Sequence, residues 1–581
     1  MRPGMKITVV LALSVGTILP IVQPQAVAGA GFTFHGSGYG HGLGMSQWGA
    51  YGMAKMGWSH HRILRHFYQG TEVQRPRLPA AVRIGLTTDR SVVHLTAKGG
   101  PVSIWERATL VGRIPGGQTW TVAAKPNGFA VKDASRSLVR GRRWGDRATP
   151  LVLTYENTGS RVFIPEADAI WYEGFEYARG SIEIDLHDCA DGCDERLIAR
   201  LGMDEYLYGL GEVSASWPVE TLRAQAVAAR SYAAYAIKRY GLRTDCACHL
   251  TDGAGDQTYM GYDRESGTMG DRWVAAVKAT SGEAVTYGGS IIQAFYAASD
   301  GGHSENVEDV WHGGNDAMAI PWLSGVCDPG ESTEANPWTD WERPMDAATV
   351  TTRLAPYTGS IGTVTSFDQM VRGVSGRIVT VRVIGSGGSD VISGLQLRAG
   401  LGLPDDRVWI NADRTISGQI RERYDRLMCA PGLPVSETKT VPGGAQQLFT
   451  ESGLYRNGRL DLTVWIKGSI DEEYRELGAG AGILGVPVAK VGPLSGIRAA
   501  SCASCQRAIF ARGRIYRSAA TGAHGLWGLI LETYLANGGA SGWLGFPLTR
   551  VRDRPDGGVR ARFENGSIRC PAGAPCESVA G

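Results

Sequence analysis

Between Ala81 and Leu186 the sequence is a succession of short alternating runs separated by turn residues. The runs VRIGL, VVHLTA, TWTVAA, PLVLTY and SIEIDL place apolar side chains near every second position, and Gly, Pro and Asn lie between them. This pattern is typical of short strands with one buried face that are joined by turns. The 80 glycines and the 20% of charged residues indicate the same β-rich, turn-rich extracellular class.

A helix rich in alanine follows this strand region. The stretch YLYGLGEVSASWPVETLRAQAVAARSYAAY, residues 206–235, predicts a helix because its alanines have high helix propensity and allow close packing. We expect Ser216 to cap this helix, Pro218 to lie in its first turn and Glu220 to sit at its positive end. A second helix is expected over 271–282, followed by strands over 284–289 and 290–299.

Glu212 is a single carboxylate in the apolar stretch that precedes this helix. Such surroundings raise the pKa of a carboxyl, which suits it to protonate the leaving oxygen of a glycosidic bond. Gly209 and Gly211 would let the main chain approach a polymeric substrate closely. The alternative is an ordinary surface glutamate that points into solvent or pairs with Arg223 or Arg230.

The C-terminal part of the chain contains an internal repeat. YRELGAGAGILGVPVAKV from Tyr474 aligns with YLANGGASGWLGFPLTRV from Tyr534, and a shared unit follows each copy, FARGRI at Phe510 and FENGSI at Phe563. A repeated unit of this size predicts a small array with its own architecture.

The N-terminus predicts export. Arg2 and Lys6 precede the apolar run ITVVLALSVGTILPIV, and AVA at residues 26–28 supplies the small residues of a cleavage site. An uncleaved anchor is the alternative, but the run contains Pro20 and its 16 residues fall short of the roughly 20 that span a bilayer. The mature protein is therefore expected to start near Gly29, with no membrane contact after cleavage.

Ten cysteines agree with an oxidising compartment. They fall into sequence-close couples, with two left over: Cys189 and Cys193, Cys246 and Cys248, Cys502 and Cys505, Cys570 and Cys576, then Cys327 and Cys429. The four C-terminal cysteines, Cys502, Cys505, Cys570 and Cys576, are expected to pair among themselves. The other six allow about 15 connectivities. The formal net charge of +2 and the absence of a basic block argue against nucleic acid as a partner.

Three separated motifs resemble the SpoIID/LytB family of bacterial cell-wall proteins. These are DEYLYGLGEVSASWPVETLRAQAVAARSYAAYA from Asp204, FYAASDGGHSENVEDVW from Phe295 and GYGHGLGMSQWGAYGMA from Gly38; with GLQLRAGLGLPDDRVWI from Gly394 the resemblance covers about 31–410. It implies an α+β, β-rich fold. The GHGxGMSQ segment closes the domain in many members, so its N-terminal place here implies a circular permutation, in which the loop still reaches the cleft.

Members of this family are lytic transglycosylases that cut peptidoglycan glycan strands lacking stem peptides, or enhancers of wall amidases. By residue match Glu212 inherits the catalytic role: as an acid it protonates the oxygen between muramic acid and glucosamine, and as a base it helps the C6 hydroxyl attack C1, which leaves a 1,6-anhydro end. Hydrolysis is the alternative, because a second acid would permit it. The candidates for that acid are Asp204, Glu205, Glu220 and Asp256.

The resemblance also implies residues that bind the glycan. These are His41, Ser46 and Gln47 of the glycine loop, Gln225 and Arg230 of the AQAVAAR block, and Ser299, Gly301 and Gly302 of the SDGG segment. Helix packing, surface pairing and a structural turn are the alternatives for these three groups.

No metal is assigned to the site. Cys246, Cys248 and His249 are the alternative, a zinc site, because some family members carry zinc in the corresponding region, but the C-x-C spacing is tight and a fourth ligand is lacking. The sequence SHHRILRH offers His60, His61 and His66, a pattern more typical of a solvated helix face than of a metal site.

The C-terminal repeats resemble LGFP repeats, which are associated with attachment to the wall arabinogalactan of mycolic-acid bacteria. The match rests on LGVP, LGFP and the intervening GRIYRSAATGAHGLWGLI. Trp527, Trp543, Tyr516 and Tyr534 are candidates to stack on sugar rings or, alternatively, to form the cores of small repeats.

The chain is thus expected to be a secreted, wall-associated enzyme in five parts: a signal peptide (1–28), the glycine loop and its helix (29–78), a SpoIID/LytB-like domain (79–430), a linker (431–445) and LGFP repeats (446–581). Peptidoglycan strands are its expected partner, with arabinogalactan and a wall amidase as further candidates. A non-catalytic enhancer of an amidase and a purely adhesive scaffold are the competing hypotheses.

Overall fold

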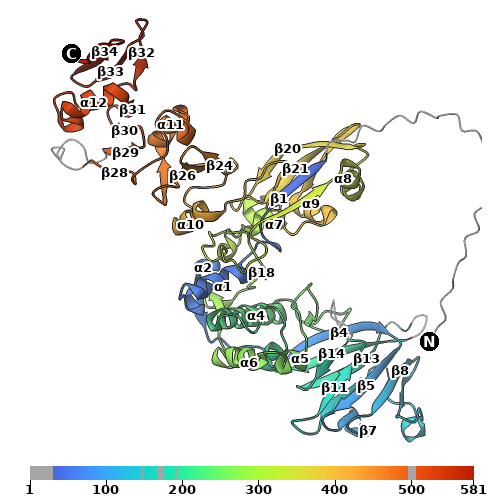
Figure 1. Ribbon diagram of the computed structural model, residues 1–581. Helices are drawn as coiled ribbons and strands as arrows, with labels where there is room; N and C mark the ends of the chain where they lie inside the picture. The colour runs from blue at the N-terminus through green and yellow to red at the C-terminus, as the bar shows by residue number, and fades with distance from the viewer. Residues whose placement is uncertain (1–30, 147, 168–173, 188, 190–192, 495–504) are drawn as a thin grey trace, which may run out of the picture.

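The fold was analysed in a computed structural model that describes residues 31–146, 148–167, 174–187, 189, 193–494 and 505–581. The predicted signal peptide and its cleavage site lie outside these residues. Figure 1 shows a sheet-rich lobe, a helical middle, a second smaller lobe and an arm that carries the C-terminus.

Two antiparallel-rich sheets form the first lobe and share one core of buried aliphatic and aromatic side chains. The larger sheet has the order β15 (Leu250–Thr251), β4 (Val82–Arg90), β14 (Asp194–Leu201), β13 (Ser181–His187), β10 (Leu151–Tyr155), β6 (Val102–Glu106), β7 (Thr109–Ile114). The smaller sheet has the order β12 (Phe175–Tyr177), β11 (Arg161–Ile164), β5 (Val92–Lys98), β8 (Thr119–Lys125), β9 (Gly128–Lys132). The alternating burial along β5, β8 and β13 confirms the predicted strands.

The alanine-rich helix α4 (Val219–Tyr240) is the centre of the helical middle. It packs against α3 (Met203–Tyr208) and α6 (Gly270–Ala279), and α5 (Tyr262–Ser266) lies beside α6. The expected cap by Ser216 is wrong: helix α4 begins after Pro218 with no side-chain cap, and the Ser216 hydroxyl lies 2.8 Å from that of Ser214. In the loop that leads into α4, the Arg272 guanidinium instead donates to the main-chain carbonyls of Ala215 at 2.6 Å and Trp217 at 3.0 Å.

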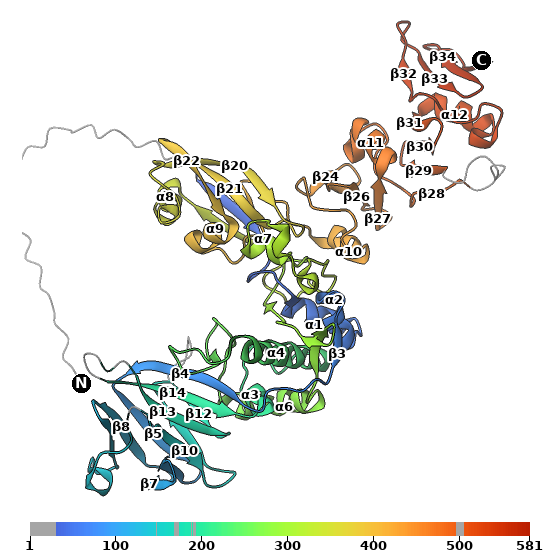
Figure 2. The same ribbon diagram turned by 180° about the vertical axis from the view of Figure 1, so that it is seen from behind.

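The N-terminal segment covers α4 from another side. Helices α1 (Gln47–Lys55) and α2 (His60–Phe67) both contact α4, as the two opposite views show (Figures 1 and 2). Short ladders fix this segment: β2 (Met45–Ser46) pairs in parallel with β18 (Tyr296–Ala297), and β3 (Glu72–Gln74) pairs with β16 (Ala284–Tyr287), which also pairs with β17 (Ser290–Ile291).

The second lobe is built from two three-stranded sheets and two helices. One sheet has the order β19 (Trp341–Met345), β1 (Phe32–Gly36), β23 (Val408–Ile410), and the other the order β20 (Val364–Arg372), β21 (Ile378–Gly385), β22 (Gly388–Ser393). Helices α8 (Ala347–Leu354) and α9 (Gly394–Leu401) complete its core, and α7 (Val307–Trp311) lies between the lobes (Figure 2).

The arm begins with α10 (Gly418–Arg426) and continues as three four-stranded antiparallel units. The first unit is β24 (Lys439–Val441), β25 (Gly444–Leu448), β26 (Ser452–Asn457), β27 (Leu462–Lys467) and α11 (Gly468–Glu476). The second is β28 (Gly492–Pro493), β29 (Gln506–Phe510), β30 (Gly513–Ser518), β31 (Gly522–Trp527) and α12 (Gly528–Ala536), and the third is β32 (Arg552–Asp553), β33 (Val559–Phe563), β34 (Gly566–Cys570) and β35 (Glu577–Ala580). Strands β24 and β25 begin inside the range expected to be a linker, and the domain boundaries otherwise stay a prediction.

The repeated sequence letters have a physical reason. The Tyr474 hydroxyl donates to the Gly485 carbonyl at 2.8 Å, and the Tyr534 hydroxyl donates to the Gly545 carbonyl at 2.7 Å. Both glycines have a positive φ, 69° and 71°, which other residues rarely adopt. Each tyrosine ring also stacks on the phenylalanine of the following unit. The shared residues therefore join each repeat to the next one.

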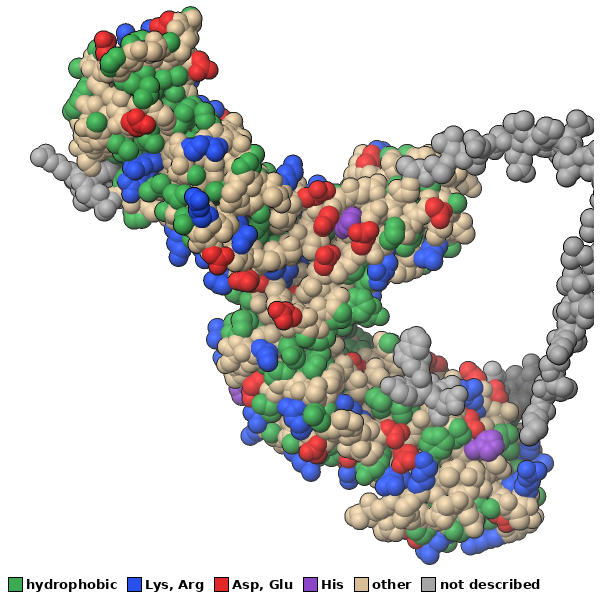
Figure 3. All heavy atoms as spheres, in the orientation of Figure 1, with side chains coloured by type: hydrophobic (Ala, Val, Ile, Leu, Met, Phe, Trp, Pro, Cys, Tyr) green, Lys and Arg blue, Asp and Glu red, His purple; other side chains and the backbone are tan. Residues whose placement is uncertain are grey.

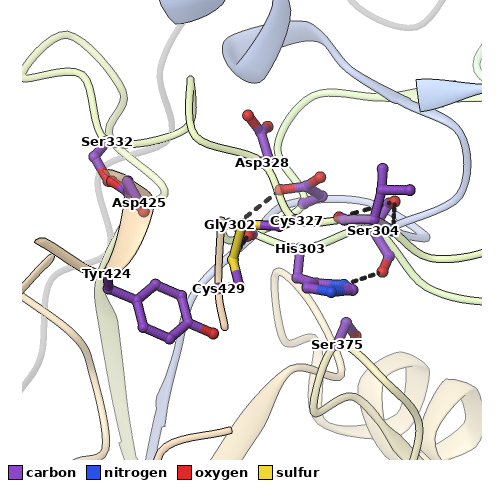
Figure 4. Close-up of a disulfide and its surroundings, with 12 residues drawn as sticks. Gly302, His303, Ser304, Cys327, Asp328, Ser332, Ser375, Tyr424, Asp425 and Cys429 are labelled. Atoms are coloured by element: carbon purple, nitrogen blue, oxygen red, sulfur yellow. Dashed lines mark hydrogen bonds between the residues drawn. A yellow bond between two sulfur atoms is a disulfide. The ribbon is translucent and has the colours of Figure 1, made fainter. Parts of the chain in front are cut away.

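Four disulfides lie wholly within the described residues: Cys189–Cys193, Cys246–Cys248, Cys327–Cys429 and Cys570–Cys576. Cys505 is also disulfide-bonded. The two leftover cysteines thus pair across 102 residues, and Figure 4 shows their bridge beside Gly302, His303 and Ser304. This bridge fastens the segment after α10 to Cys327, whose main chain pairs with His303 next to the SDGG segment.

The described part of the chain confirms a mixed, β-rich fold of helices and sheets. Circular permutation of the GHGLGMSQ segment stays a prediction. Within the described residues, no helix is both long and apolar enough to cross a bilayer.

Replacing Cys327 and Cys429 together by alanine is expected to lower the free energy of unfolding by about 2 to 5 kcal/mol, because the bridge closes a loop of 102 residues. Urea unfolding, followed by tryptophan fluorescence and circular dichroism, measures the loss. The matched control removes Cys570–Cys576, whose separation of 6 residues predicts a cost of about 2 kcal/mol at most. Equal losses in the two variants would contradict this.

Candidate functional site

Glu212 lies in the loop between α3 and α4, where the main chain pairs with residues 258–260. Leu210 and Tyr259 form a bridge, and the Gly211 N–H donates to the Thr258 carbonyl at 2.9 Å. A Cβ on Gly209 would lie 2.4 Å from the Tyr259 ring, so a glycine is needed there for protein packing. The sequence suggested that Gly209 lets substrate approach the main chain, whereas in the structure Gly209 makes room for the Tyr259 ring.

The Glu212 carboxylate is half-buried and accepts a hydrogen bond from the loop that contains Thr258. The Thr258 N–H donates to its Oε1 at 2.6 Å. Burial raises the pKa of Glu212, and this effect outweighs the hydrogen bonds from the Thr258 main chain, Gln47 and Tyr296, which favour the charged form. The carboxyl is therefore both biased towards protonation and provided with donors that stabilise its anion.

Of the two glutamines expected to bind substrate, Gln47 hydrogen-bonds Glu212 and Gln225 contacts Gln47. Gln47 is the first residue of α1, and its Nε2 donates to the Gln225 Oε1 at 3.3 Å. Gln225 is wholly buried in α4, and its own Nε2 has no hydrogen-bond partner. The N-terminal segment and the alanine-rich helix thus meet at the catalytic candidate.

Tyr296 completes this group from β18. Its hydroxyl accepts a hydrogen bond from Gln257 Nε2 at 2.7 Å, and the Tyr206 hydroxyl donates to Gln257 Oε1 at 2.9 Å. Burial, and then the charge of Glu212, raise the pKa of both tyrosines well above the usual value, so both stay neutral donors. Thr258, Gln257 and Tyr296 were not anticipated from the sequence, where Thr258 is 46 positions away from Glu212.

His41 is joined to this group through the main chain. Its Nδ1 accepts from the Leu43 N–H at 3.0 Å, and its ring hydrogen-bonds the main chain of Tyr296. Burial, followed by the nearby Arg398 and Arg377, lowers the pKa of His41 to about 4. His41 is therefore a neutral imidazole at pH 7.

Ser46, Ser299 and Gly301 meet at Glu331 rather than at Glu212. The Ser46 hydroxyl donates to Glu331 Oε2 at 2.9 Å, the Ser299 hydroxyl donates to Oε1, and the Gly301 N–H donates to Oε1 at 3.2 Å. All four residues are buried. Asp300 and Asp328 are buried beside them, and burial together with the Glu331 charge raises the pKa of Asp300 to about 8. In this structure the three residues hold a buried carboxylate.

Arg230 is likewise bound within the protein. Its guanidinium, fully buried, donates to Asp204 Oδ1 at 3.0 Å and to the carbonyls of Glu283 and Val277. The structure therefore brings Gln47 to Glu212, with Gln225 behind Gln47, and leaves Arg230 with partners of its own.

The four candidates for a second acid also have other partners. Asp204 binds Arg230, Glu205 accepts from the Gly202 N–H that opens α3, Glu220 binds His60 and Arg223, and Asp256 binds Arg243 through both oxygens. None of these four presents a free carboxylate to pair with Glu212, which favours chemistry with a single carboxyl group.

Two known protein families match separate parts of the chain, and one of these parts contains the Glu212 site. A model of the stage II sporulation protein SpoIID matches residues 193–287, which include Glu212, Gln225 and Thr258, and a model of the LGFP repeat matches 484–542. The chain carries a SpoIID domain and LGFP repeats. The predicted resemblance to both families is therefore confirmed.

Two curated relatives share parts of the sequence. The chain is 30% identical over 175 residues to an uncharacterized protein of Brachyspira hyodysenteriae, which is 30% of this chain and 43% of that protein. It is 35% identical over 112 residues to the amidase enhancer of Bacillus subtilis, 19% of this chain and 13% of the enhancer. The chain thus spans less than half the length of either relative.

The zinc alternative within the SpoIID domain is wrong. Cys246 and Cys248 are joined in a disulfide, so neither sulfur is a free thiolate, and His249 Nδ1 accepts from the Arg83 N–H at 3.0 Å.

Three half-buried aromatic rings lie together beside the Glu212 loop of the SpoIID domain. Trp48 follows Gln47 in α1, Trp217 ends the loop, and their centroids are 4.6 Å apart; Tyr51 lies 5.2 Å from Trp217. Half-buried rings of this kind are able to stack on sugar rings. The sequence signal was present in GMSQWGAY and SASWP, but only the fold brings the two segments together.

Glu212→Gln is expected to raise the free energy of unfolding at pH 7 relative to wild type, and less so at pH 4. The folded-state pKa of Glu212 lies above its ordinary value of 4.5, so its contribution to stability is present below pH 4.5 and is lost as the pH rises through the raised value. Glutamine removes that loss. Urea unfolding at pH 4, 5, 6 and 7 measures the difference.

The exposed Glu72 of β3 gives the control for this series. Glu72→Gln is expected to change the free energy of unfolding by a similar, small amount at each pH. A Glu212→Gln difference that stays constant or shrinks as the pH rises would refute the assigned pKa direction.

Proposed function

We propose that this protein is an exported cell-wall enzyme that cleaves peptidoglycan glycan strands by lytic transglycosylation, with Glu212 as its acid and base. The observation that carries the proposal is a single half-buried carboxyl group, that of Glu212, which has a raised pKa and neutral hydrogen-bond donors around it. The four candidates for a second acid are each bound to other partners.

In the proposed reaction protonated Glu212 gives its proton to the oxygen that links muramic acid to glucosamine, and the bond from C1 to that oxygen breaks. The Glu212 anion is stabilised by the Thr258 N–H and then takes the proton of the C6 hydroxyl, while the C6 oxygen forms a bond to C1. Glu212 is protonated again at the end, a 1,6-anhydro ring is formed, and no water is consumed. Gln47 and the ring cluster of Trp48, Tyr51 and Trp217 would bind the strand, and the buried Gln225 would orient Gln47 through its Oε1.

Glu212→Gln is expected to lower strand cleavage by about 10² to 10⁴-fold, because glutamine has no proton to give. Mass spectrometry of products from intact and amidase-stripped peptidoglycan measures this, and 1,6-anhydro ends are the expected product. Glu72→Gln should cleave like wild type. Reducing ends would mean hydrolysis, and equal cleavage by Glu212→Gln and wild type would remove Glu212 from the mechanism.

A non-catalytic enhancer of a wall amidase is the second candidate, favoured by the similarity to the Bacillus amidase enhancer. It predicts no strand cleavage by the folded protein alone and undiminished stimulation of an added wall amidase by Glu212→Gln. The same preparations therefore distinguish the two functions.

We propose further that the LGFP repeats hold the protein on the wall, with arabinogalactan as the candidate ligand. Tyr516 and Tyr534 are buried in the repeat core, Trp527 is half-buried against that core, and Trp543 is 44% exposed. Hydrophobic side chains gather on the arm in the space-filling view (Figure 3). Of the four aromatic candidates, Trp543 is therefore the one whose exposure best suits it to stack on a sugar ring.

Trp543→Ala is expected to weaken sedimentation of the full chain with purified mycolic-type walls by up to about tenfold, because it removes one stacking surface. The matched control is Leu242→Ala, because Leu242 is an exposed apolar residue that lies just after α4 and outside the repeats. Unchanged sedimentation of Trp543→Ala would place the binding surface elsewhere.

A further inference from the structure

Two histidines and two glutamates from three separate segments meet on one side of the helical middle. His60 and His61 open α2, Glu220 lies in the first turn of α4, and Glu283 lies in the turn between α6 and β16. The cluster is distinct from the Glu212 group, and no step of the proposed reaction uses it. His66 of the same helix is excluded from it, because its Nε2 contacts the Cys327 carbonyl at 2.7 Å.

The Glu220 carboxylate fixes the orientation of the His60 ring. Glu220 Oε2 lies 2.8 Å from His60 Nδ1 and also accepts the His60 main-chain N–H at 2.7 Å, while Arg223 binds the other oxygen at 2.6 Å. When the Nδ1–H of a neutral His60 donates a hydrogen bond to Glu220, the Nε2 of His60 carries a lone pair. A carboxylate that binds the outer nitrogen of a metal-ligating histidine has this arrangement.

The free ring nitrogens converge on one oxygen atom. Glu283 Oε2 lies 3.2 Å from His60 Nε2 and 3.4 Å from His61 Nε2, and Arg75 holds the other oxygen of Glu283 at 3.2 Å. Two ligand atoms that bind zinc at about 2.0 to 2.1 Å in a tetrahedron are about 3.3 to 3.4 Å apart. Both observed separations are close to this value.

His60 lies between two carboxylates, so a neutral His60 always turns one unprotonated ring nitrogen towards a carboxylate oxygen, either of Glu220 or of Glu283. A divalent metal ion between His60 Nε2 and Glu283 would replace that repulsion by coordination, and His61 Nε2 could bind the same ion. Imidazole and carboxylate together are a donor set suited to zinc. The side chains of His60 and Glu283 are 15% and 12% exposed and that of His61 is 45% exposed, which leaves a route for an ion and a position for a water ligand.

We propose that His60 Nε2, His61 Nε2 and Glu283 Oε2 form a zinc site in which Glu220 orients His60 and a solvent molecule is the fourth ligand. The site ties the N-terminal segment to the start of α4 and to the turn before β16. Because α1 precedes α2 in that segment, the metal would brace the element that carries Gln47. The proposal does not rest on the enzymatic activity.

The test is zinc binding by the mature full-length protein, freed of tag and stripped with a chelator. Titration calorimetry with zinc chloride is expected to give one equivalent per chain, and cobalt chloride is expected to give the visible absorption of a tetrahedral ion. His61→Ala and Glu283→Gln should weaken zinc binding at least about 100-fold, and Glu220→Gln about 10 to 100-fold. Thermal unfolding should shift upwards with zinc only where binding is kept.

The matched control is His94→Ala, which removes a histidine that contacts a glutamate, Glu166, at 2.6 Å but lies outside the cluster. It should bind zinc like wild type. Circular dichroism without metal verifies that each variant is folded. Failure of wild type to bind one equivalent of zinc, or zinc binding by His61→Ala or Glu283→Gln that is as tight as that of wild type, would overturn the site.

Discussion

The buried Arg377 guanidinium holds the glycine loop and the SDGG segment in place. It lies 2.9 Å from Asp405 Oδ2 and 3.5 Å from Asp406 Oδ1, and it donates to the main-chain carbonyls of Asp300 and His303, each at 2.9 Å. A Cβ on Gly42 of the loop would lie 2.2 Å from the guanidinium carbon, and the φ of this glycine is 69°. Only glycine allows this approach, and removal of one partner from such a buried pair costs about 3 to 5 kcal/mol.

A second buried charge carries this order on to the candidate site. Glu331 receives the hydroxyls of Ser46 and Ser299, so it joins the end of the glycine loop to the SDGG segment. Ser46 is also the N-cap of α1, because its hydroxyl accepts the Gly49 N–H at 2.9 Å. The next residue, Gln47, is thereby fixed beside Glu212. Ser46 and Ser299, which the motifs predicted to bind glycan, instead position the residues that lie next to the Glu212 carboxyl group.

The sequence predicted what depends on local periodicity and failed where distant segments decide. Alternation along β5 and β13, and the alanines of α4, were sufficient because burial of one face follows from spacing alone. The cap by Ser216 failed because Arg272, far along the chain, binds the carbonyls of that turn. Thr258 and Tyr296 escaped notice for the same reason. Glu212 was found through its motif, not through any property of its own that spacing reveals.

Burial of Glu212 opposes stability, and the surrounding structure has to compensate for it. A carboxyl group keeps a raised pKa only while its neighbours exclude water, and those neighbours come from α1, from β18 and from the loop of Thr258. Two of these three elements are held by the paired strands β2 and β18, and hence by the network around Glu331 and Arg377. The buried ion pairs therefore serve the site indirectly, because they fix the segments whose contact with Glu212 makes it an acid.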